Sequence, residues 1–148
     1  MDATMAVVWD GSLSVGHAGI DADHEHLVHL LGRVEDAVLN KTDLPVGQVF
    51  VELADYAMSH FQREEQYMQR HHFPGLAEHK RMHDNLLAEL GQLVDRAEIN
   101  EQSLDQSVLE FLRHWVADHI VTWDMELARY LGTHADYADG AATEALKA

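Results

Sequence analysis

The sequence predicts an all-α fold, an antiparallel up-down-up-down four-helix bundle with an extended N-terminal arm. Apolar residues recur at steps of three and four along four long stretches, which is the spacing of one helical face, and no stretch alternates as a β-strand does. Short connections favour antiparallel neighbours. The 148 residues fit a single domain, 1–148, with an arm (1–19), a bundle (20–131) and a tail (132–148).

The first two helices follow an arm that contains glycines and shows no helical period. The first helix is expected over residues 21–40. Thr42 or Asp43 can cap the second, with Pro45 tolerated in its first turn, and this helix should stop near the Phe-Pro-Gly sequence at 73–75. The inward faces are predicted to carry His24, Leu27, Val28, Leu31, Val34 and Val38, and then Val49, Leu53, Ala57 or Tyr56, His60 and Glu64.

The third helix is expected over residues 76–97 and the fourth over 104–131, with a polar linker between them. The tail from residue 133 is rich in Ala, Asp and Gly and should fray. The inward faces here are Leu86, Leu87, Leu90 and Val94, and then Val108, Leu112, Trp115 and His119.

Composition excludes several classes of protein. Lys and Arg number 10 against 26 Asp and Glu, a net charge of −16, so nucleic acid and anionic membrane surfaces are poor partners. No apolar run approaches the roughly 18 residues of a membrane span, and the N-terminus has no basic region typical of a signal peptide. The chain has no cysteine, which excludes disulfides, thiolate zinc sites and iron–sulfur clusters. We expect a cytoplasmic location.

Histidine is unusually frequent, with 12 residues, and imidazole is the commonest neutral metal ligand. His60 and Glu64 are four residues apart on one helix, and His79 and His83 are four apart on the next. The full inward set is His24, His60, Glu64, His79, His83, His119 and Asp124. Burying five imidazoles and two carboxylates without partners would cost several kcal/mol, and a shared metal centre removes that cost.

Each element of this pattern also has an ordinary structural explanation. A lone inward histidine is usually a hydrogen-bonded core residue, and a His pair on a helix is often solvated. Seven such residues in phase with the core on four helices favour the metal site. The other histidines are expected to be exposed or peripheral, namely His17, His26, His29, His71, His72, His114 and His134. Glu65 and Asp118, beside candidate ligands, are expected to face solvent.

Four ordered motifs resemble those of hemerythrins, especially the single-domain bacterial form. They are IDADH at 20–24, HFQREE at 60–65, HKRMH at 79–83 and WVADHIVTWD at 115–124. The Phe-Pro turn and Trp9 in the arm match as well, so the resemblance covers residues 9–131.

The resemblance implies reversible binding of O2 at a non-haem di-iron centre, for oxygen carriage, storage or delivery, without enzymatic activity. It assigns His79, His83 and His119 to one iron, His24 and His60 to the other, and Glu64 and Asp124 as bridges. A bridging oxo or hydroxo group would complete the Fe²⁺/Fe³⁺ pair and leave one position for O2. O2 is the expected partner, with an oxygen- or electron-accepting protein as a further candidate.

Apolar residues that flank the ligands are candidates for the wall of an O2 pocket. These are Phe61, Trp115, Val116 and Ile120, and ordinary core packing is a compatible explanation for them. Two positions depart from the family pattern. Val116 stands where Leu is frequent, and Asp23 stands where Gln or Glu is usual.

Other uses of the same site remain open. Oxygen or redox sensing and iron storage are alternatives, and an adventitious zinc or structural site predicts a colourless protein. A di-iron oxidase or oxygenase is less favoured, because ferritin-like bundles use Glu-x-x-His motifs and this sequence contains none.

The spacing of His119 and Asp124 requires an irregular helix. At about 100° per residue, a separation of five places the two side chains about 140° apart. Either Asp124 approaches from the flank of the inward stripe, or the helix widens locally into a π-type turn. We favour the π-type turn, because such irregularities concentrate at functional sites.

Overall fold

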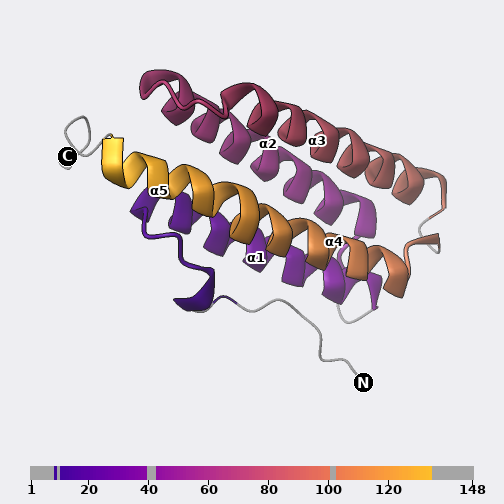
Figure 1. Ribbon diagram of the computed structural model, residues 1–148. Helices are drawn as coiled ribbons and strands as arrows, with labels where there is room; N and C mark the ends of the chain where they lie inside the picture. The colour runs from indigo at the N-terminus through magenta and orange to yellow at the C-terminus, as the bar shows by residue number, and fades with distance from the viewer. Residues whose placement is uncertain (1–8, 10, 40–42, 101–102, 135–148) are drawn as a thin grey trace.

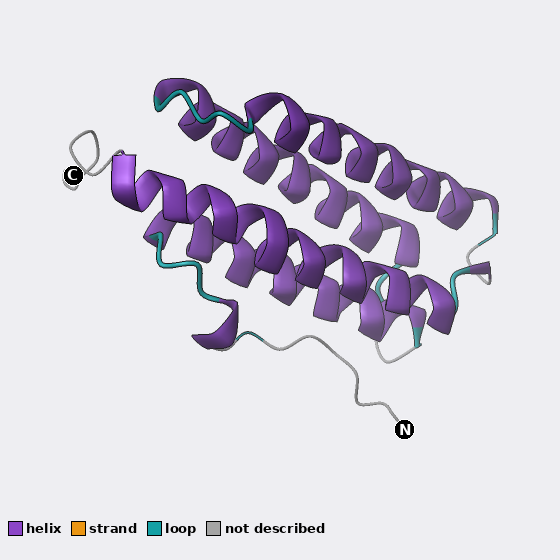
Figure 2. Cartoon of the chain, viewed as in Figure 1, coloured by secondary structure: helices purple, strands orange, loops and turns teal. Residues whose placement is uncertain are grey.

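The computed structural model describes residues 9, 11–39, 43–100 and 103–134, and the regular structure of this part of the chain is entirely helical (Figure 2). The elements are η1 (Gly11–Leu13), α1 (Ala18–Val38), α2 (Val46–Arg70), α3 (Leu76–Ile99), α4 (Gln106–Asp118), η3 (His119–Asp124) and α5 (Met125–His134). The last three follow one another without a break and form a single rod (Figure 1).

This rod and the helices α1, α2 and α3, here called the four rods, form the predicted antiparallel bundle. Successive rods run in opposite directions (Figure 1), α2 packs against both α1 and α3, and α4 packs against α1. The backbones of α3 and α4 approach one another less closely than these pairs do. No helix in the described ranges is long and apolar enough to cross a membrane.

Two helix starts differ from the sequence-based expectation. α1 begins at Ala18 rather than near residue 21, because the backbone N–H of Ile20 donates to Nδ1 of His17 and so caps the helix. α2 begins at Val46 with Pro45 as its N-cap, in an extended conformation that makes no side-chain cap bond. Pro45 therefore precedes the first turn instead of lying in it, and Asp43 does not cap the helix. Thr42 lies outside the described residues, as does the tail beyond residue 134.

The core consists of two apolar clusters with a polar layer between them. The larger cluster includes Leu27 on α1, Phe61 on α2 and Val116 on α4. The smaller one consists of Ile20, Met68, Phe73, Leu127 and Leu131. On α1 and on the last rod the candidate ligands fall between residues of the two clusters, and on α2 Glu64 falls between Phe61 and Met68. The polar layer is therefore enclosed by apolar side chains at both ends.

The fourth rod contains the expected irregularity. η3 is a π-helical turn that runs from His119 to Asp124, between two regular α-helices. A π turn takes up one extra residue, so a separation of five then lies on one face. The prediction of a local widening at this point is confirmed.

Candidate metal centre

All four rods contribute to the polar layer. α1 supplies His24, α2 supplies His60 and Glu64, α3 supplies His79 and His83, and η3 supplies His119 and Asp124. None of the seven is more than 2% exposed. The structure therefore brings together all seven residues that the sequence singled out.

The Nε2 atoms of the five imidazoles converge on the two carboxylates. Asp124 Oδ2 lies 2.5 Å from His24 Nε2, 3.2 Å from His60 Nε2 and 2.7 Å from His119 Nε2. Glu64 Oε1 lies 3.0 Å from His83 Nε2 and 3.3 Å from His79 Nε2. Two further contacts join an imidazole to the other carboxylate: His79 Nε2 is 3.1 Å from Asp124 Oδ1, and His60 Nε2 is 3.1 Å from Glu64 Oε2.

The donor atoms form two groups that share both carboxylates, with all atoms of a group within 4.8 Å of one another. One group contains His24, His60 and His119, and the other contains His79 and His83. The resemblance implied instead that His119 joins His79 and His83. His119 Nε2 lies 2.7 Å from Asp124 Oδ2, which His24 and His60 also face, and 3.8 Å from Glu64 Oε1, which His79 and His83 face, so the division of the imidazoles between two metals stays a prediction.

Both buried carboxyls are ionised. Burial raises the pKa of Glu64 and Asp124, but the charges and hydrogen bonds of the surrounding imidazoles lower it by more, so the pKa of each lies below its usual range. Burial lowers the pKa of His119, which favours its neutral form. Burial lowers the pKa of His60 and His79, but their contacts with Glu64 and Asp124 raise it by more, well above the usual value for His60 and to about 9 for His79, so protonated imidazoles supply positive charge beside the two carboxylates.

The local geometry also fits metal ions, which would replace the imidazole protons as the source of positive charge. Glu64 Oε2 and His119 Nε2 are buried without a hydrogen-bond partner, although each lies close to an atom of opposite character. Three imidazole nitrogens also crowd the single oxygen Asp124 Oδ2, where hydrogen bonding would occupy about two lone pairs. Nitrogen and oxygen donors that face one another in this way are arranged as ligands of shared cations, and such donors suit divalent first-row metals.

Two acidic residues orient candidate ligands by contacting the ring nitrogen Nδ1, on the side of the imidazole away from the centre. Asp23 Oδ2 lies 3.0 Å from His60 Nδ1, and this carboxylate also accepts hydrogen bonds from Arg63 and from the Tyr56 hydroxyl. Burial alone would raise the pKa of Asp23, but these partners hold it well below its usual range. Glu65 Oε2 lies 2.9 Å from His83 Nδ1. The expectation that Glu65 faces solvent was wrong, because its side chain is only 20% exposed and turns toward α3.

A sequence signal for both contacts existed. Asp23 directly precedes His24, so on a helix it points about 100° away from that ligand, toward a neighbouring rod. Arg63, next to Glu64 on α2, is a natural counter-ion for Asp23. Glu65 directly follows the candidate ligand Glu64, so it also points about 100° away from an adjacent ligand. A ligating histidine almost always donates its other ring N–H to a carboxylate, carbonyl or water, so acids adjacent to ligands are the residues to examine.

The other expected positions divide as follows. His26, His29, His72, His114 and Asp118 are exposed, as predicted. His71 is buried at the end of α2 but is not in the cluster, and His17 is half-buried. The side chain of His134 lies outside the described residues.

Three of the four wall candidates lie against the ligands or in the adjoining core. The Phe61 ring stacks on His83 with centroids 3.9 Å apart and planes 9° apart. Trp115 lies 6.3 Å from His119 with an interplanar angle of 22°. Val116 is buried in the larger apolar cluster. The side chain of Ile120 lies outside the part of the structure that is described.

Comparison with known proteins identifies the family. The model of the hemerythrin HHE cation-binding domain matches residues 15–131, which include all seven candidate ligands. Bacteriohemerythrin of Stenotrophomonas maltophilia is 30% identical over 128 residues, covering 86% of this chain and 83% of that protein. Myohemerythrin of Riftia pachyptila is 26% identical over 113 residues, covering 76% and 83% respectively. A crystal structure of a hemerythrin variant superposes with a TM-score of 0.75 at 25% identity, covering 84% of this chain and 97% of that one.

The domain match spans the polar layer and both apolar clusters that enclose it. The chain therefore belongs to the hemerythrin family, whose members have a non-haem di-iron domain and generally bind oxygen.

Proposed function

We propose that this chain binds O2 reversibly at a di-iron centre and serves in oxygen carriage, storage or delivery, without catalysing a reaction. One observation carries the proposal. Seven buried donors from four rods face one another in a layer closed by apolar side chains at both ends. The proposed partner is O2, together with a protein that accepts oxygen or electrons, and the proposed location is the cytoplasm.

In this proposal the five imidazoles bind iron through Nε2, and Glu64 and Asp124 bridge the pair. Both carboxylates belong to both donor groups, which is what bridging requires. The two irons, when bound, supply the electrons and the open coordination position that O2 needs. Five neutral imidazoles and two carboxylates make a histidine-rich donor set that suits Fe²⁺.

The surrounding residues then have two tasks. Asp23 and Glu65 hold the Nδ1 protons of His60 and His83, which fixes each ring so that Nε2 faces the centre. Phe61, Trp115 and Val116, with Ile120 as a further proposed member, form an apolar wall that keeps water and protons away. Exclusion of protons is what makes oxygen binding reversible rather than oxidative.

Visible absorption of the iron-loaded protein tests the proposal directly. The protein is reduced without oxygen, exposed to air and then returned to argon. We expect an absorption band that appears in air and disappears under argon through several cycles. An oxidase or oxygenase would lose the reduced state in one exposure while consuming O2. A zinc or structural site would stay colourless throughout, and either result would overturn the proposal.

A further inference from the structure

A hollow of about 220 Å³ lies between α3 and α4 and reaches a candidate ligand. Its outer rim carries the exposed residues Phe111, His114 and Asp118. The hollow occurs where α3 and α4 make fewer close backbone contacts than α2 makes with α1 or α3. Looser packing at this seam gives small side-chain movements room to open a path inward.

The depth of the hollow follows a gradient of burial. Below the rim, Met82 and Leu86 on α3 and Trp123 on η3 are half-buried. The innermost lining residues are Trp115, which is 4% exposed, and the candidate ligand His119, which is 2% exposed. The hollow therefore connects solvent with the edge of the polar layer through mainly apolar side chains.

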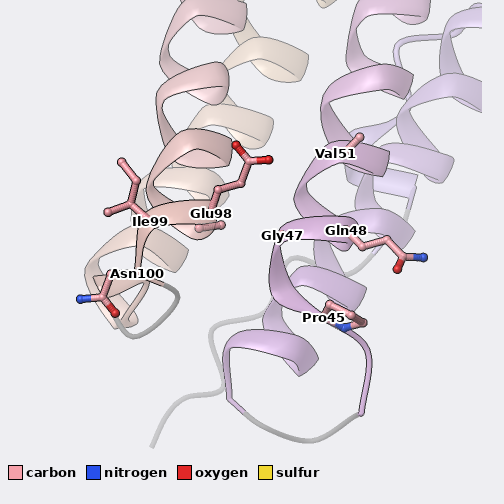
Figure 3. A pocket seen from close by; sticks show the side chains of 8 residues that line it. Pro45, Gly47, Gln48, Val51, Glu98, Ile99 and Asn100 are labelled. Carbon is pink, nitrogen blue, oxygen red and sulfur yellow. The ribbon is translucent and has the colours of Figure 1, made fainter.

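Two other hollows among the described residues do not reach the centre. One lies between the start of α2 and the end of α3, and its lining includes Gly47, Gln48 and Val51 of α2 and Glu98 and Ile99 of α3 (Figure 3). The other lies on the outer side of α1 and α2 around His29 and Ser59. Neither is lined by a candidate ligand.

We infer that the α3–α4 hollow is the passage through which O2 and other small neutral molecules reach the centre, with Met82, Leu86 and Trp115 as its gate. The inference rests on the proposed function. All seven candidate metal ligands are buried, so O2 must cross a layer of protein to reach them, and this hollow is lined by one of them, His119.

The chemistry of the lining selects what passes. An apolar molecule such as O2 loses little on leaving water, whereas an anion must shed its hydration at a cost of several kcal/mol. Asp118 at the rim and the net charge of −16 repel anions further. Met82 is unbranched and flexible, so it can move aside on the timescale of side-chain rotation.

Trp115 closes the inner end. Its ring is nearly parallel to that of His119, with centroids 6.3 Å apart, and its buried Nε1–H has no hydrogen-bond partner among the described residues. A shift of this one ring would join the hollow to the centre.

The absence of cysteine allows a reversible plug. Met82→Cys creates a single thiol inside the passage, to which a benzyl group is attached through a disulfide and later released by a thiol reductant. Ser59→Cys is the matched control, because Ser59 is also half-buried and lines a hollow that does not reach the centre. Leu86→Cys replaces Met82→Cys if circular dichroism shows that the latter does not fold.

The first measurement is the rate of O2 uptake by the iron-loaded protein in a stopped-flow instrument. With the plug in place we expect uptake and release each to slow by about tenfold or more, with little change in affinity, because the plug blocks the path and not the bound state. Reduction of the plug should restore both rates, and the plugged Ser59→Cys protein should match the unmodified chain. Unchanged rates with the plug in place would overturn the inference.

A second measurement does not depend on the proposed function. In the Zn²⁺-loaded chain carrying Trp9→Phe, O2 quenches the fluorescence of Trp115 and Trp123, which both line the passage. The plug should reduce the quenching rate severalfold, and the control should not. If the iron-loaded chain binds no O2 while the plug still reduces quenching, the proposed function fails and the passage stands. Equal quenching rates with and without the plug would overturn the inference that the hollow is a passage.

Discussion

Residues that never face the centre help to define it. Asp23 accepts hydrogen bonds from Arg63, Tyr56 and His60 at once, so its carboxylate is fixed on three sides. A fixed acceptor keeps the proton of His60 on Nδ1 and leaves the Nε2 lone pair for a metal. The family pattern has a longer side chain here, and the shorter Asp23 reaches His60 while Arg63 and Tyr56 close around it.

Removal of this charge should weaken metal binding without unfolding the bundle. We expect Asp23→Asn to lower iron affinity by about 10- to 100-fold, the usual effect of losing an outer hydrogen-bond partner. Competition with a chelator measures the affinity. Asp118→Asn is the control, since Asp118 also precedes a candidate ligand directly but is exposed. Equal losses in both variants would show that general charge matters and the contact with His60 does not.

Loss of an imidazole should have a larger effect. His83→Ala should leave the chain unable to hold its full iron content, and it should also destabilise the bundle by exposing Glu64 and Glu65 to an unfilled space. His72→Ala should do neither, because His72 is exposed at the end of α2. Elemental analysis and thermal unfolding of both variants make the comparison. Iron loss from His72→Ala would mean that the histidines have been assigned wrongly.

At the scale of elements, the π turn η3 solves a problem that the sequence posed. A regular helix would turn Asp124 away from the centre, yet Asp124 contacts four imidazoles there. The turn takes up one residue more than an α-helix, which brings His119 and Asp124 onto one face. The π turn also sets the register of α5, so that Leu127 and Leu131 lie in the smaller apolar cluster.

Deletion of the exposed Thr122 should therefore be tolerated. It leaves His119 and the acid four residues apart, which a regular α-helix places on one face, and it preserves the register of α5. We expect iron content and helicity near those of the parent chain. Deletion of the exposed Glu110 in α4 should abolish iron binding, because it rotates everything that follows by about 100°. Loss of iron from the Thr122 deletion would show that the centre needs the wider turn itself.

The sequence predicts the inward positions well because burial and helical phase are local properties. The phase of His24, His60 and His119 with neighbouring Leu and Val residues placed them correctly, and the spacing of Asp124 predicted the π turn. The contacts of Asp23 and Glu65 depend on how neighbouring rods are rotated about their axes. That rotation is set by packing across the whole bundle, which single-helix periodicity does not contain.

At the scale of the whole molecule, the centre lies where the bundle would otherwise be weakest. Two apolar clusters flank a layer of ionised carboxylates and imidazoles. Seven donor groups exceed what one octahedral ion accepts, and they divide into two sets that share Glu64 and Asp124. Elemental analysis of the purified chain should therefore find close to two irons per chain. One metal per chain, or mainly zinc, would contradict the paired centre.

Removal of iron should lower the stability of the entire bundle, because the metals neutralise charges that folding has buried. Without them, protonated imidazoles alone balance the buried Glu64 and Asp124, and the loss of the metal–ligand bonds costs several kcal/mol. For a chain of this size about 1 kcal/mol shifts the melting temperature by roughly 2–4 °C, so we expect the iron-free protein to melt at least about 10 °C lower. Calorimetry before and after chelation measures the shift. Re-addition of Fe²⁺ should reverse it, whereas Mg²⁺, which prefers an all-oxygen site, should not. Equal melting temperatures with and without iron would mean that the polar layer is balanced by protonated imidazoles alone.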